Sequence, residues 1–132
     1  MIRGWFVVVI LISVAFLFAA CQSGNPEETT PAAKALVAYL NALVAKDEAG
    51  LTLLSCADWE ANALLELDSF QSVETHLEGL SCQQTASTEG SATVICQGAI
   101  VTSYGDEVQE FDLSERTYRL VQQGSDWLVC GY

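Results

Sequence analysis

Five cysteines and a single histidine are the side chains of this 132-residue chain with the widest chemical range. Cysteine thiols can form disulfides, hold a metal, carry a lipid or act as nucleophiles. No two of the cysteines have the CxxC spacing that is typical of redox motifs and many zinc sites. Cys21 closes an apolar N-terminal segment, whereas Cys56, Cys82, Cys96 and Cys130 are spread over the rest of the chain. Their chemistry therefore depends on the compartment that the chain reaches.

The N-terminal segment predicts export. Arg3 precedes an apolar run from residue 5 to residue 18, which has the length of a signal-peptide core and falls short of the roughly 20 apolar residues of a membrane span. The sequence Leu17-Phe18-Ala19-Ala20-Cys21 resembles the lipobox of bacterial lipoprotein signals, although a phenylalanine stands where that pattern usually has leucine. The resemblance implies removal of residues 1–20, acylation of Cys21 and an anchor in the bacterial cell membrane. The alternative is an uncleaved N-terminal anchor, and both place the domain outside the cytoplasm because the basic residue stays inside.

In an oxidising location, an even set of four remaining cysteines favours two disulfides. A turn centred near Glu89 places Cys82 opposite Cys96 in a hairpin. The bond Cys56–Cys130 would then join the helical part of the chain to its last strand. Zinc held by cysteines and His76 is the alternative, but we expect no metal and no other cofactor.

His76 is the one candidate catalytic side chain. On a strand it shares a face with Glu74 and Glu78, and adjacent carboxylates stabilise a protonated imidazole. Such a trio could bind a metal or transfer a proton, but a solvated strand face is the interpretation that we favour, because no second constellation supports the site. No GxSxG, HExxH, phosphate-binding or EF-hand motif supports a second catalytic constellation.

Three aromatic residues are candidates for the lining of a cavity: Tyr39, Trp59 and Tyr118. Aromatic side chains line many ligand pockets. They also pack cores without any ligand, and the sequence leaves both interpretations open.

The net charge excludes one class of partner. It is −12 for the whole chain, with 17 acidic residues, and becomes −13 when Arg3 leaves with the signal segment. Such a charge repels phosphate backbones, so we expect no nucleic-acid partner. The acidic residues are interleaved with apolar ones, which indicates a solvated surface rather than a cation site.

Residues 21–30 form a polar tether after the lipidated cysteine, and residues 31–132 form a single α+β domain. Thr30 and Pro31 predict the start of a helix over about 31–45. Asp47 predicts the cap of a short second helix, and Ser55 with Asp58 predicts a capping box for a third.

From Val73 onward, alternation predicts about four antiparallel strands. A parity shift beside Gly79 indicates a bulge in the first strand, although a helix over 69–78 fits the spacing about as well. The second strand is predicted over 92–103. Residues 111–121 predict a single third strand, and residues 127–132 predict the fourth and last.

This order of elements, with Tyr39-Leu40-Asn41-Ala42-Leu43 and the ending Trp127…Cys130-Gly131-Tyr132, resembles small bacterial lipoproteins with nuclear transport factor 2-like (cystatin-like) domains. The resemblance implies helices on a curved sheet that forms a cone around the first helix. That superfamily holds isomerases, dehydratases and non-catalytic modules, so the fold does not choose a function. We expect a tethered, non-catalytic module that binds a small apolar ligand or docks a protein partner. The alternative is a pocket enzyme of the isomerase or dehydratase type that uses His76 or a buried carboxylate as its base.

Overall fold

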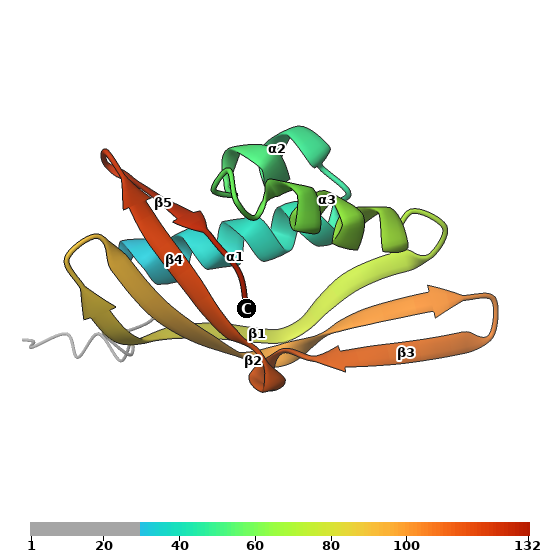
Figure 1. Cartoon of the computed structure of the whole chain (residues 1–132). Coiled ribbons are helices and arrows are strands. Elements are labelled where there is room, and N and C mark those ends of the chain that lie inside the picture. Colours follow the sequence, from blue (N-terminus) through green and yellow to red (C-terminus); the bar gives the residue numbers. More distant parts are fainter. Residues whose placement is uncertain (1–29) are drawn as a thin grey trace, which may run out of the picture.

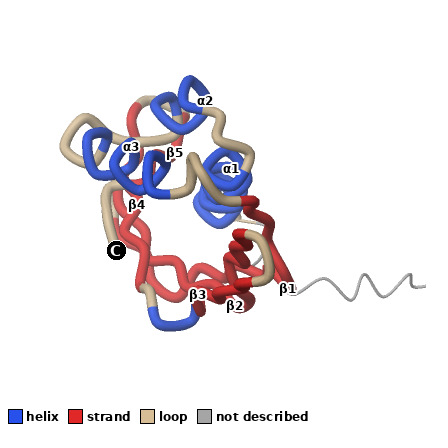
Figure 2. The backbone as a smooth tube through the Cα atoms, turned by 90° about the vertical axis from the view of Figure 1, so that its right-hand side faces the viewer, coloured by secondary structure: helices blue, strands red, loops and turns tan. Residues whose placement is uncertain are grey.

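The computed structural model describes residues 30–132, in which three helices precede five strands (Figure 1). The expectations for the signal segment, for Cys21 and for most of the tether lie outside the described residues. The predicted fold class is confirmed, because the helices pack on one face of a curled antiparallel sheet that forms half of a barrel (Figure 2).

Helix α1, Pro31–Val44, begins where the sequence predicts. The Thr30 hydroxyl accepts a hydrogen bond from the Ala33 backbone N–H, and Pro31 occupies the first helical position, where its missing N–H costs nothing. One face of α1 is fully buried against the sheet, which makes this helix the centre of the core (Ala32, Ala33, Leu36, Tyr39, Leu40 and Leu43). Helix α2, Glu48–Leu53, is capped by Asp47, as predicted.

Helix α3, Glu60–Ser69, begins later than predicted, and the capping box was wrong. Trp59 is the N-cap residue and has no side-chain capping bond. Ser55 instead donates from its hydroxyl to the Leu51 carbonyl at 2.8 Å and lies in a bridge with Val129. The serine is drawn into that bridge by backbone hydrogen bonds to the last strand, which the local sequence does not indicate.

The sheet is built on a long hairpin of β1, Glu74–Thr88, and β2, Ser91–Tyr104. One end of β2 pairs with β3, Glu107–Asp112, and the other end pairs with β4, Thr117–Gln123. Strand β5, Asp126–Val129, pairs with β4. The strand interpretation of residues 74–78 is therefore confirmed against the helical one.

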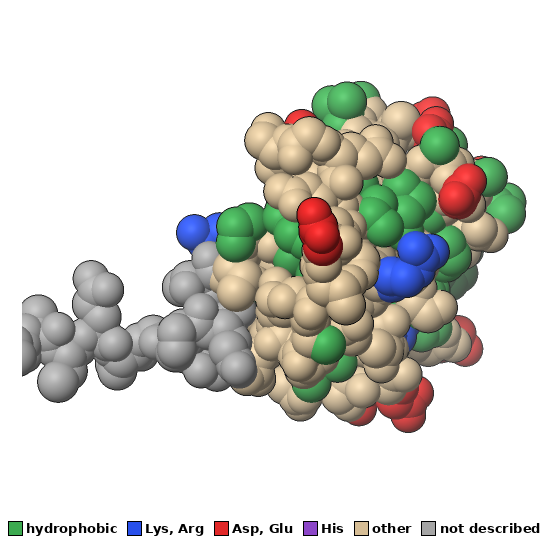
Figure 3. Space-filling view, turned by 60° about the vertical axis from the view of Figure 1, so that its left-hand side comes forward, with side chains coloured by type: hydrophobic (Ala, Val, Ile, Leu, Met, Phe, Trp, Pro, Cys, Tyr) green, Lys and Arg blue, Asp and Glu red, His purple; other side chains and the backbone are tan. Residues whose placement is uncertain are grey.

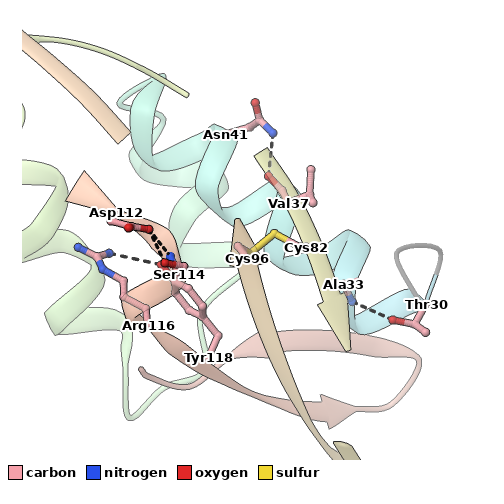
Figure 4. Close-up of a disulfide and its surroundings, with 10 residues drawn as sticks. All are labelled: Thr30, Ala33, Val37, Asn41, Cys82, Cys96, Asp112, Ser114, Arg116 and Tyr118. Carbon is pink, nitrogen blue, oxygen red and sulfur yellow. Dashed lines mark hydrogen bonds between the residues drawn. A yellow bond between two sulfur atoms is a disulfide. The ribbon is translucent and has the colours of Figure 1, made fainter. Parts of the chain in front are cut away.

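The single strand predicted around residues 111–121 was wrong. It is two strands, β3 and β4, separated by the 3₁₀ turn η1, Leu113–Glu115. Asp112 stabilises this turn by accepting hydrogen bonds from the backbone N–H and the hydroxyl of Ser114, at 2.8 and 2.6 Å (Figure 4). Leu113 is fully buried and alternates with Phe111, but the apolar positions then change parity to Tyr118 and Leu120, a sign of the break that the prediction did not use.

The predicted bulge lies in β1, where the pairing register shifts between Glu78 and Ser81. Gly98 on β2 faces the bulge with a φ of +100°, and a Cβ there would meet the Gly79 backbone at 2.7 Å. Only glycine fits this close approach. The bulge lets the long hairpin bend around α1.

Both predicted disulfides are present. Cys82 lies directly opposite Cys96 in the β1–β2 pairing (Figure 4), and Cys56 is bonded to Cys130. Two disulfides are typical of proteins in oxidising compartments outside the cytoplasm. Among residues 30–132, no helix is long and apolar enough to cross a membrane.

Candidate functional site

The structure brings the three predicted aromatic residues together in one place. Tyr39 comes from α1, Trp59 from the start of α3 and Tyr118 from β4. The indole Nε1 of Trp59 donates a hydrogen bond to the Tyr39 hydroxyl at 3.1 Å. Tyr39 and Tyr118 are fully buried. Four open depressions at the surface of residues 30–132 are lined by other residues than these three.

Beside these rings lies an ion pair that the sequence analysis missed. Nη1 of Arg116 lies 2.8 Å from Oε1 of Glu66 and 3.3 Å from the Tyr118 hydroxyl. The two charged side chains are only 17% and 12% exposed. A pair removed this far from water is far more sensitive to loss of one partner than a surface pair.

Tyr132 covers the ion pair. Its hydroxyl donates to Oε1 of Glu66 at 3.2 Å, and its ring centroid lies 4.2 Å from Cζ of Arg116, a cation–π contact. The same ring packs edge-on against Trp59 and tilted against Tyr118, with centroids 5.4 and 5.2 Å apart. Tyr132 nevertheless remains 49% exposed. We call this group the Arg116 cluster; its members are Tyr39, Trp59, Glu66, Arg116, Tyr118 and Tyr132.

One oxygen of the cluster has an unused hydrogen-bonding capacity. Oε1 of Glu66 receives hydrogen bonds from Arg116 and from Tyr132, whereas Oε2 is buried and has no hydrogen-bond partner among the described residues. An ionised carboxylate accepts hydrogen bonds at both oxygens, and a buried acceptor without a partner is costly. Because this oxygen has almost no exposed surface, a donor from outside the domain could reach it only if the side chains that cover it moved.

The tyrosines of the cluster are held in their neutral form. Burial raises the pKa of Tyr118 to about 12, although hydrogen bonding to Arg116 works against the shift. Burial also raises the pKa of Tyr39, against the effect of its bond to Trp59, and burial together with Glu66 raises the pKa of Tyr132. Burial lowers the pKa of Arg116, but its contacts with Tyr118 and Glu66 outweigh burial and raise it overall. Arg116 thus stays charged and the three tyrosine hydroxyls stay neutral across the physiological pH range.

Local structure explains how pairs of residues in the Arg116 cluster come to lie on one face, but the sequence alone indicates only part of the cluster. Trp59 and Glu66 are seven residues apart, which is about two helical turns, so they lie on the same face of α3. Arg116 and Tyr118 are two residues apart at the start of β4, the spacing of side chains on one face of an extended segment. The sequence separations of 50 and 66 residues from Glu66 to its partners left no pattern to find.

The structure places His76 away from this cluster. Its side chain is 57% exposed, and Nε2 lies 3.0 Å from Oε1 of Glu78, which is itself 63% exposed. Glu74 and Glu78 lie on the same exposed face of β1, as the strand pattern predicts. Within residues 30–132, no group of three or more His, Cys, Asp or Glu side chains is arranged to hold a metal ion.

Comparison with known proteins does not assign the chain to a family. No protein-family model matches its sequence, and no curated protein matches it either.

Proposed function

We propose that this chain is an extracytoplasmic lipoprotein, anchored through Cys21, whose nuclear transport factor 2-like domain docks a partner protein at the Arg116 cluster. The single observation that carries the docking role is the half-exposed Tyr132 ring, which lies over a largely buried ion pair with an unpartnered carboxylate oxygen. The two disulfides support the extracytoplasmic location. The curled sheet around α1 supports the family resemblance.

The composition of the cluster is that of an interface hot spot. Tyrosine, tryptophan and arginine are the residue types that most often dominate binding energy in protein interfaces. Tyr132, Trp59 and Arg116 are already held by mutual contacts, so little side-chain freedom would be lost on binding. A small apolar ligand has less support, because the buried rings of Tyr39 and Tyr118 occupy the interior instead of leaving it open.

The expected partner presents a basic side chain at its contact surface. Oε2 of Glu66 lacks a donor but is buried, so a lysine or arginine of the partner would supply one only when the Tyr132 ring moves aside. The net charge of −12 favours association with a positively charged surface. Binding should therefore weaken as the salt concentration rises.

Site-specific photocrosslinking in the host cell envelope tests the docking role. A benzophenone amino acid replaces Asn62, which is exposed on α3 one turn before Glu66. The matched probe replaces His76 on the other face of the sheet. We expect a discrete adduct from position 62, none of the same mass from position 76, and loss of the adduct when Tyr132→Ala or Glu66→Gln is added. An adduct that persists in both variants, or no adduct at all, would exclude docking at the cluster.

The anchor has its own test. A radioactive fatty acid supplied to growing cells should label the wild-type chain and leave Cys21→Ser unlabelled. Label that still enters the Cys21→Ser chain would contradict lipidation at that residue.

A further inference from the structure

An open groove lies at the end of the domain where α1 begins. It has a volume of about 340 Å³. The first turn of α1, the end of α2 and strand β5 line it, chiefly through Pro31, Lys34, Leu53, Leu54, Trp127 and Leu128. A second open depression, lined by Glu48, Ala49, Thr52 and Leu53, adjoins it through the shared leucine. On this side of the domain, hydrophobic and basic side chains lie next to one another (Figure 3).

The apolar residues of the groove are left in contact with water. Leu53 is 78% exposed, and Trp127 and Leu128 are only partly buried. Leu53 is the most exposed large hydrophobic residue in the described part of the chain. Exposed apolar side chains gathered at a groove indicate contact with another apolar surface.

The length of the tether points to what that surface is. Nine residues, 22–30, separate Cys21 from Pro31. They span at most about 30 Å when fully extended. A lipid on Cys21 therefore keeps the Pro31 end of the domain, and with it the groove, close to the bilayer.

We propose that this groove is a membrane-contact surface, with Leu53 entering the boundary between headgroups and acyl chains and Trp127 lying at headgroup level. Tryptophan is enriched at that level in membrane proteins, and the Lys34 ammonium can reach lipid phosphates while its stem packs on apolar surface. Asp126 lines the same groove and the domain is strongly acidic, so the surface fits zwitterionic headgroups. Tethering supplies the high effective concentration that such a weak contact needs.

This inference rests on the proposed lipid anchor, and its test uses the lipidated chain. The protein is reconstituted into phosphatidylcholine vesicles with or without bromine on the acyl chains near the headgroup. Bromine quenches tryptophan only at close range. We expect brominated lipid to reduce the emission of the wild-type chain and to leave Trp127→Phe, which retains Trp59, unquenched. Trp59 should stay unquenched because it lies away from the groove. It bonds to Tyr39, which is eight residues, or about 12 Å, along α1 from Pro31.

Two leucine variants form a matched pair. Leu53→Ser should lose most of the quenching, whereas Leu65→Ser, which changes a leucine 67% exposed on α3, should keep it. Equal emission of the lipidated wild type in the two kinds of vesicle would overturn the proposal while leaving the anchor intact. Mass spectrometry that finds no acyl group on Cys21 would remove the anchor and this inference together. Quenching that appears only as the protein is diluted in the membrane would assign the groove to a second copy of the chain and also overturn the proposal.

Discussion

Replacing Arg116 by methionine should test the energetics of the Arg116 cluster most directly. Methionine keeps much of the length of the arginine stem but removes the charge that lies 2.8 Å from Glu66. Glu66 is then left half-buried, with only the Tyr132 hydroxyl still bonded to it. Breaking a buried pair by removing one partner costs about 3–5 kcal/mol, whereas exposed pairs contribute about 0.2–1 kcal/mol.

The exposure of the pair decides between these limits. With exposed fractions of 17% and 12%, the pair is nearer to the buried case, although some solvent screening remains. The cation–π contact with Tyr132 adds about 0.5–1 kcal/mol. We therefore expect Arg116→Met to lower the free energy of unfolding by about 3 kcal/mol, a large part of the roughly 5–15 kcal/mol that stabilises a domain.

Urea unfolding with the disulfides intact measures this loss, followed by tryptophan fluorescence and by far-ultraviolet circular dichroism. A double-mutant cycle with Glu66→Gln isolates the pair. The double variant should cost about 2 kcal/mol less than the sum of the single variants, because no unpaired charge remains. Glu78→Gln is the matched control, since its partner His76 is exposed, and it should stay within about 0.5 kcal/mol of wild type. A loss below about 1 kcal/mol for Arg116→Met, or simple additivity in the cycle, would refute the reasoning.

Two further predictions concern the disulfides and the alkaline limit of stability. Cys56 and Cys130 are 74 positions apart, and Cys82 and Cys96 are 14 apart. By loop entropy, replacing each pair with serines should lower the free energy of unfolding by about 4.4 kcal/mol for the first pair and about 3.0 kcal/mol for the second. Calorimetric unfolding midpoints in the reverse order would contradict this prediction. The pKa of Tyr118 is about 12 in the folded chain and about 10 in the unfolded chain. The stabilisation that follows from this difference is therefore complete below pH 10 and is lost as the pH rises through 12. From this residue alone, the free energy of unfolding should fall by about 3 kcal/mol between pH 10 and pH 12. In Tyr118→Phe this part of the loss should be absent. Urea unfolding midpoints at several alkaline pH values measure the difference.

Local chemistry made much of the fold predictable. The Thr30 and Asp47 caps fixed the starts of two helices, and each side chain accepts the expected backbone N–H. The turn near Glu89 set the hairpin register, which in turn set the partners of Cys82 and Cys96. In each of these cases the interacting groups are close in sequence or related by a single hairpin.

What could not be predicted depends on distant pairing. Ser55 has a good capping sequence but forms a bridge with Val129, which lies 74 positions later in the sequence. Leu113 continues the alternation of β3 into the 3₁₀ turn, and the change of apolar parity to Tyr118 was not taken as a break, so β3 and β4 merged in the prediction. Glu66 and Arg116 looked like two ordinary surface charges, because nothing near either residue indicates that the sheet curls far enough to bring them together.

The Cys56–Cys130 bond has a consequence for the two outer rings of the cluster. Cys56 precedes Trp59 by three residues, and Cys130 precedes Tyr132 by two. The covalent link thus ties both aromatic rings to one short frame, which is otherwise held by the backbone hydrogen bonds of Val129 to Leu54 and Cys56. If the Arg116 cluster docks a partner as proposed, formation of the Cys56–Cys130 bond would also fix the two outer rings of that surface relative to each other.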